Sequence, residues 1–183
     1  MAAIADTPQA RARMERLERI WQEPGGLLGW LKTTDHKRIG ILYLFTSLLF
    51  FGAGGVEALL VRTQLAQPNL HVLGPQAYNQ VFTMHGVTMI FLFVIPISTG
   101  AFGNYLVPLM IGARDMAFPR MNALSYWLYL ASGIFMYVGL LSGHGPDAGW
   151  FNYVPLASKA YDPGNNIDFY ALGLIFNGIA TTL

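Results

Sequence analysis

The residue in this sequence best suited to chemistry is His85, which is the only histidine or charged residue in the apolar run of residues 80–108. A run of about 20 apolar residues is long enough to cross a bilayer as a helix. An imidazole in such a helix loses its hydration, so it is expected to have a partner. It could ligate a metal or haem, relay protons, or hydrogen-bond to a neighbouring helix. The segment by itself leaves these roles open.

The composition indicates a membrane protein. Apolar residues make up 54% of the chain and charged residues only 11%, whereas soluble domains average about 25% charged residues. Cysteine is absent, which excludes disulfides and thiolate metal sites. The formal net charge of +1 argues against a broad nucleic-acid surface, so we expect no nucleic-acid partner. We predict an all-α, polytopic transmembrane helix bundle.

Four apolar segments predict membrane-spanning helices: residues 39–61, 80–108, 123–142 and a fourth that starts near residue 169. We expect Pro96 to kink the second helix and Pro108 to end it. The fourth segment reaches Leu183 with no Gly cap, basic residue or Pro after it. We therefore expect the sequence to be the front part of a longer protein, with its last span cut off.

Residues 1–38 are predicted to form a cytoplasmic basic arm, and residues 39–183 the transmembrane domain. Charged and apolar residues alternate at helical spacing in the arm: Arg11, Arg13, Met14, Glu15, Arg16, Leu17, Glu18, Arg19, Ile20 and Trp21. This pattern predicts a short amphipathic helix that lies on the membrane lipid or a partner subunit, or else a solvated helical arm. Thr33 or Thr34 is expected to cap the first spanning helix.

The distribution of Lys and Arg predicts the topology. Seven lie in the arm and two, Arg114 and Arg120, in the loop after the second span, while the loops after the first and third spans have only Arg62 and Lys159. The positive-inside rule therefore places the N-terminus in the cytoplasm. His85 is then near the outer end of the second span, and Asp115 is at the inner end.

Five motifs occur in a fixed order: DHKRIGILYL (35–44), ALLVRTQL (58–65), FTMHG (82–86), GNYLVPLMIGARDMAFPRMN (103–122) and GW..Y.PL (149–156). Together they resemble subunit I of haem–copper terminal oxidases, especially the bacterial caa3-type cytochrome c oxidases, over residues 33–183. The resemblance implies a twelve-helix bundle in the bacterial inner membrane, associated with oxidase subunits II and III. In that family electrons pass from cytochrome c through a low-spin haem to a high-spin haem and copper, oxygen is reduced to water, and protons are pumped outward.

The resemblance implies two contacts with low-spin haem A. His85 matches an axial ligand of the iron, a role that a neutral imidazole suits. Gly86 beside it would leave room for the macrocycle. Arg62 matches an arginine that contacts the haem formyl group, although by residue type alone it would be an interfacial anchor. No role is predicted for Glu57.

The resemblance also implies a proton route, the D-pathway. Asp115 matches the carboxylate at its cytoplasmic mouth, and the residues that match its lining are Asn104, Asn122, Ser125 and Tyr43. A carboxylate can collect protons, while amides and hydroxyls hold ordered water. By residue type alone, Asp115 could instead pair with Arg114 or Arg120. The second axial ligand, the high-spin haem ligand and the copper ligands are expected beyond residue 183, so this chain alone could not reduce oxygen.

Three alternatives remain. A quinol oxidase of the same superfamily shares most of the motifs. A membrane transporter or channel could use an intramembrane histidine and a cytoplasmic aspartate gate, although the internal repeat that would favour this class is not seen. A structural membrane subunit without a cofactor would tolerate replacement of His85.

Overall fold

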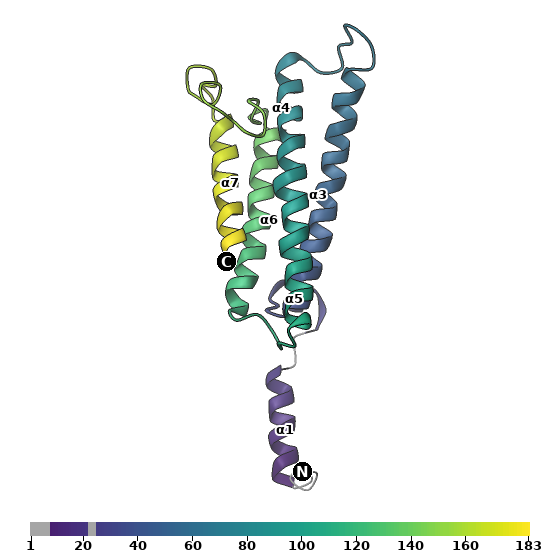
Figure 1. The fold of residues 1–183 in the computed structure, drawn as a ribbon, viewed down its shortest axis with the longest axis vertical. Coiled ribbons are helices and arrows are strands. Elements are labelled where there is room, and N and C mark those ends of the chain that lie inside the picture. Colours follow the sequence, from purple (N-terminus) through teal and green to yellow (C-terminus); the bar gives the residue numbers. More distant parts are fainter. Residues whose placement is uncertain (1–7, 22–24) are drawn as a thin grey trace. The chain divides into compact units, whose positions relative to one another are not determined.

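The structure, a computed structural model, describes residues 8–21 and 25–183. The chain forms two compact units, residues 1–33 and residues 34–183. All regular secondary structure in the described residues is helical (Figure 1). The predicted all-α class is therefore confirmed.

The first unit contains α1 (Pro8–Trp21) and the short α2 (Gly26–Leu31). Helix α1 covers the segment for which an amphipathic helix is predicted. Met14 and Leu17 are exposed within this unit, whereas the side chains of residues 18–21 lie outside the described part. Membrane or partner binding by this helix stays a prediction.

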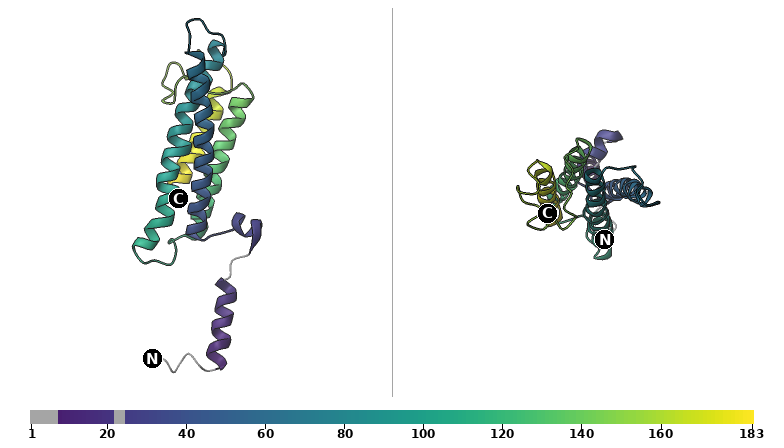
Figure 2. Two further views of the ribbon diagram at one scale, coloured as in Figure 1. Left: turned by 90° about the vertical axis from the view of Figure 1, so that its right-hand side faces the viewer. Right: turned by 90° about the horizontal axis from the view of Figure 1, so that it is seen from above.

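The second unit is an up-and-down helix bundle (Figures 1 and 2). Its elements are α3 (His36–Gln64), α4 (Pro75–Val87), η1 (Thr88–Val94), η2 (Pro96–Gly103), α5 (Asn104–Met110), α6 (Pro119–Leu141) and α7 (Asn166–Thr182). The elements from α4 to α5 form one helix, Pro75–Met110, which packs along α3, while α6 packs against α7.

Three helices of the described chain are long and apolar enough to cross a membrane: His36–Gln64, Pro75–Met110 and Pro119–Leu141. They correspond to the first three predicted spans and extend each of them at its N-terminal end. Helix α7 has 17 residues and begins a few residues before the expected fourth span. Membrane crossing by α7 stays a prediction.

The cap of α3 differs from the prediction. The N-cap is Asp35, whose carboxylate accepts hydrogen bonds from the backbone N–H groups of Lys37 at 2.7 Å and Arg38 at 3.2 Å. The expected caps, Thr33 and Thr34, precede this position. A carboxylate at the N-terminus also interacts favourably with the helix dipole, which gives Asp35 an advantage over a threonine hydroxyl.

Pro108 behaves differently from the expectation, whereas the expected kink at Pro96 stays a prediction. Pro108 does not end the helix, which runs to Met110. The helix also continues past Pro96, in a π-helical form on both sides of Ile95. A proline inside a helix removes one backbone donor, and side chains of neighbouring helices replace that donor in this bundle.

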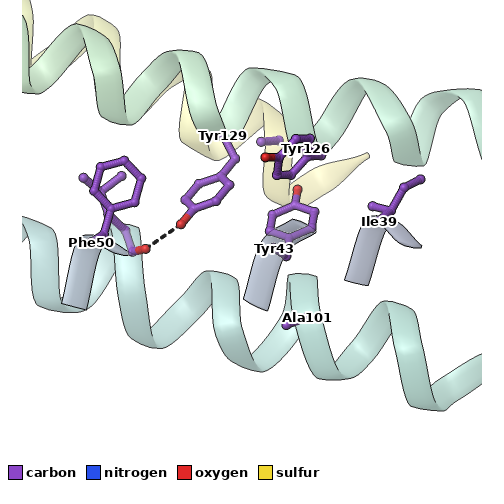
Figure 3. Packing of buried hydrophobic residues seen from close by; sticks show 8 residues of the cluster. Ile39, Tyr43, Phe50, Ala101, Tyr126 and Tyr129 are labelled. Atoms are coloured by element: carbon purple, nitrogen blue, oxygen red, sulfur yellow. Dashed lines mark hydrogen bonds between the residues drawn. The ribbon is translucent and has the colours of Figure 1, made fainter. Parts of the chain in front are cut away.

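Aromatic side chains fill the core between α3 and α6 (Figure 3). The rings of Tyr43 and Tyr129 stack with their centroids 5.1 Å apart, and Tyr126 meets Tyr43 edge-on at 5.3 Å. The ring of Phe50 fills the space beside Gly133, which has no side chain to obstruct it. This tyrosine cluster fixes α3 against α6 beside a cavity that Tyr43 and Tyr129 line.

Candidate functional site

His85 lies on α4 and is oriented by α3. Its Nδ1 atom is 3.0 Å from the carbonyl oxygen of Gly54. Because a carbonyl only accepts, Nδ1 carries the proton and the lone pair of the neutral ring is on Nε2. A histidine held in this way is prepared to bind a metal through Nε2. His85 is half-buried, so the ring is neither fully enclosed nor solvated.

The glycines of α3 near His85 leave space for a flat group. A Cβ atom built on Gly52 or Gly55 would meet no atom within 4 Å. Together with a free imidazole Nε2, this open helix surface fits a haem. Among the described residues no three His, Asp or Glu side chains converge on a metal position, so a metal at His85 would have at most two such ligands from this part of the chain.

The structure corrects the expectation for Gly86. The space beside Gly86 is occupied by Trp150 of the loop after α6, whose atoms would be 3.1–3.4 Å from an added Cβ. The absence of a side chain at Gly86 therefore allows the contact with Trp150. It does not leave room for a macrocycle at that position.

Arg62 lies in the last turn of α3 and is exposed. It is eight residues beyond Gly54, which corresponds to about 12 Å along a helix. Arg62 and His85 thus share the same end of the bundle, and the long guanidinium side chain is available to an acceptor there.

A cavity of about 260 Å³ lies near the opposite end of the bundle. Its lining includes all four of the residues predicted to line the proton route: Tyr43, Asn104, Asn122 and Ser125. Tyr43 of α3 and Ser125 of α6 hydrogen-bond to each other at 3.0 Å. One water needs only about 15 Å³ of such volume, so the cavity has room for several.

Three buried amide atoms at this cavity have no hydrogen-bond partner. Oδ1 of Asn104, Nδ2 of Asn122 and Oδ1 of Asn177 are buried without a hydrogen bond, and all three asparagines line the cavity. An unpaired buried polar atom costs about 1–3 kcal/mol. Water in the adjacent cavity would supply partners for these atoms. No site role is predicted for Asn177 from the sequence.

Asp115 is half-buried in the loop between α5 and α6. Its carboxylate accepts a hydrogen bond from the backbone N–H of Met116 at 2.7 Å. Met116 lines the cavity, whereas Asp115 does not. The structure thus groups four of the predicted proton-route residues at one cavity and places Asp115 one residue from its wall.

Glu57 is a buried acid for which the sequence provides no role. It lies on α3, is 5% exposed, and is near the hydroxyls of Thr88 and Tyr137. Those hydroxyls hydrogen-bond to each other at 3.0 Å, while neither carboxylate oxygen of Glu57 has a hydrogen bond of regular geometry. No sequence periodicity distinguishes this acid from an interfacial one.

A bundle of long apolar helices, with a cavity lined in part by polar side chains and a histidine held between two helices, is typical of a polytopic membrane protein. The sequence matches the family described as Cytochrome C and Quinol oxidase polypeptide I over residues 38–183. The chain belongs to this family. Its members are haem–copper oxidases of multisubunit complexes, so the family implies haem and copper as cofactors.

Named relatives agree with this assignment. The putative cytochrome c oxidase subunit 1-beta of Streptomyces coelicolor is 49% identical over 158 residues, which is 86% of this chain and 27% of that protein. Cytochrome c oxidase subunit 1 of Bacillus subtilis is 48% identical over 157 residues, 86% of this chain and 25% of that protein. The heme-copper oxidase subunit I+III of Aeropyrum pernix is 47% identical over 155 residues, 84% of this chain and 19% of that protein. The chain thus spans about a quarter of the length of these relatives or less.

Proposed function

We propose that this chain is part of the catalytic subunit of a proton-pumping terminal oxidase that takes electrons from cytochrome c and reduces oxygen to water. Membership of the family and the names of the relatives support the oxidase activity and the electron donor. We further propose that the protein lies in a bacterial cell membrane with its N-terminus in the cytoplasm, and that it associates with oxidase subunits II and III. The I+III name of one relative supports the association with subunit III.

The haem half-site is proposed at His85. In this role His85 would hold the iron of low-spin haem A through Nε2, while the Gly54 carbonyl fixes the orientation of the ring. Arg62 would donate hydrogen bonds to the haem formyl group, and its fixed charge would favour the reduced form. When bound, the haems and copper of the family supply electron transfer and oxygen reduction.

The proton route is proposed along the cavity. Asp115 would collect protons at the cytoplasmic end, and water held by Asn104, Asn122, Ser125 and Tyr43 would relay them inward. The observation that supports this role is the group of unpaired amide atoms at a cavity large enough for several waters. Side chains that only filled a core would pair with each other and leave no such volume.

The experiment that tests the function is a dithionite-reduced minus oxidised visible spectrum of the purified full-length protein. The wild type is expected to show a low-spin haem A band, and His85→Ala is expected to abolish it. His71→Ala is the matched control, because His71 is exposed in the loop between α3 and α4. A low-spin band that persists in His85→Ala would overturn the ligand assignment, and the absence of any haem band in the wild type would overturn the oxidase proposal.

A further inference from the structure

Pro96 leaves one backbone carbonyl without its helical donor in the middle of the second helix. In π-helical geometry residue 96 would donate its N–H to the carbonyl of Phe91, and in α-helical geometry to that of Leu92. The preceding residue shows which geometry applies, since Ile95 donates to Ile90, five residues earlier. Proline has no N–H, so the donor for Phe91 must come from elsewhere.

Two neighbouring helices supply donors at this point. The Nδ2 group of Asn177 on α7 donates to the Phe91 carbonyl at 2.8 Å. The hydroxyl of Tyr129 on α6 donates to the Leu92 carbonyl at 2.7 Å, the bond marked by the dashed line in Figure 3. In a bilayer interior such side chains are the means by which proline is tolerated.

The bond to Phe91 also determines which polar atom of the Asn177 side chain stays without a hydrogen-bond partner. A carbonyl oxygen can only accept a hydrogen bond. The amide nitrogen of Asn177 must therefore face Phe91, and its amide oxygen must face away. This oxygen is buried and has no partner. Asn177 is 4% exposed and lines the same cavity as Tyr43 and Ser125.

We propose that Asn177 is a positioning residue of the proton route: Nδ2 anchors the amide on the Phe91 carbonyl, and Oδ1 holds a water at the α7 side of the cavity. This inference rests on the proposed function and extends the route from α3, α5 and α6 to α7. Asn177 would thus join the Phe91 carbonyl, which lacks a helical donor because of Pro96, to a water in the cavity. The backbone provides no link between these two groups. The side chain therefore couples the π-helical segment to the water file.

The test uses the full-length oxidase with Asn177→Leu, which keeps the branched arrangement of side-chain heavy atoms but replaces both polar atoms by methyl groups. We expect oxygen-reduction turnover to fall about fivefold to tenfold, the scale of one lost hydrogen bond. The ratio of rates in H₂O and D₂O should rise, because proton delivery becomes the slower step, while the reduced haem spectrum is unchanged. Asn177→Ser, which keeps a hydroxyl for water, should recover most of the rate. If the leucine variant does not assemble, Asn177→Val serves in its place.

Pro96→Ala separates the two roles of the amide. Alanine restores an N–H at residue 96 that can donate to Phe91, so the structural need for Asn177 disappears in this background. Asn177→Leu should still slow turnover relative to Pro96→Ala alone. Ser132→Ala is the matched control, because Ser132 also makes a buried bond from α6 to α7, to the Gly173 carbonyl at 2.8 Å, yet does not line the cavity.

The outcomes distinguish this inference from the function on which it rests. If Asp115→Asn slows proton uptake while Asn177→Leu leaves turnover and the isotope ratio unchanged, the role of Asn177 is overturned and the proposed function stands. Loss of the leucine effect in the Pro96→Ala background would also overturn it, because the amide would then serve only the backbone. If neither Asp115→Asn nor Asn177→Leu slows turnover, both the proton route and this inference are overturned.

Discussion

The imidazole of His36, at the start of α3, donates from Nδ1 to the backbone carbonyl of Asn104, 2.8 Å away. This carbonyl is the one that an N–H at residue 108 would reach in an α-helix, and residue 108 is proline. His36 therefore replaces the donor that Pro108 lacks, as Asn177 does for Pro96. His36 is 1% exposed, which makes water a poor substitute.

His36→Leu is expected to destabilise the full-length protein by about 1–3 kcal/mol, because it leaves the Asn104 carbonyl buried without a donor. Thermal unfolding in detergent measures this cost. In a Pro108→Ala background the cost should shrink, since alanine restores the backbone donor. Equal costs in both backgrounds would show that His36 does not act through this carbonyl.

Asp115→Asn is expected to slow proton uptake and turnover about tenfold or more while leaving both haem spectra intact. An amide cannot bind and release protons near neutral pH, so the entrance of the route loses its collector. Proton uptake after rapid reduction, followed with a pH dye, measures the effect. Normal uptake in this variant would show that Asp115 serves only the local backbone through its bond to Met116.

Gly100→Ala is expected to destabilise the protein by about 1–3 kcal/mol. An added Cβ would overlap the ring of Tyr43, and that ring cannot retreat because it is held by Tyr129 and by its hydrogen bond to Ser125. Gly103→Ala is the matched control on the same helix, because the nearest atom to its Cβ is 3.8 Å away. Thermal unfolding of both variants decides the prediction, and equal stabilities would contradict it.

Asp162, in the loop before α7, is expected to make stability depend on pH. Its burial, and then the charge of Asp147, raise the pKa of this carboxyl above its ordinary value. The folded protein therefore holds the proton more tightly than the unfolded chain. The stability contributed by the protonated form is complete below the ordinary pKa of about 4 and is lost as the pH rises through the raised value.

Asp162→Asn removes this dependence, so the variant should gain stability relative to wild type as the pH increases from 4 toward neutrality. Unfolding temperatures of both proteins across this range give the difference directly. Asp168→Asn is the control, since Asp168 is exposed and pairs with Lys159 at 3.8 Å. A difference between Asp162→Asn and wild type that stays constant with pH would contradict the raised pKa.

Much of the fold could be predicted from the sequence because it depends on local properties. The three long apolar helices follow from hydrophobic length alone, and the candidate ligand His85 is recognisable as an imidazole in an apolar run. The Asp35 cap and the extension past Pro108 were not predicted. Both depend on which hydrogen-bond donor or acceptor lies nearest in space, and the helix propensities of the residues contain no information about that.

The proton-route residues show the same division. Asn104, Asn122, Ser125 and Tyr43 could be named from motifs, but their convergence on one cavity is a property of helix packing. These residues belong to three helices, α3, α5 and α6. They line one cavity only because the tyrosine core fixes α3 against α6.

By itself the sequence determined that this chain is a helical membrane protein with a histidine in its second span, because bilayer thickness and hydrophobicity act residue by residue. Only the tertiary structure decided what Asn177 does. Its bond to Phe91 joins residues 86 positions apart, and it exists because Pro96 left a carbonyl unpaired inside an apolar bundle. Such a need arises from packing, where a buried acceptor must find a donor on another helix, and no local pattern in the sequence records which helix supplies it.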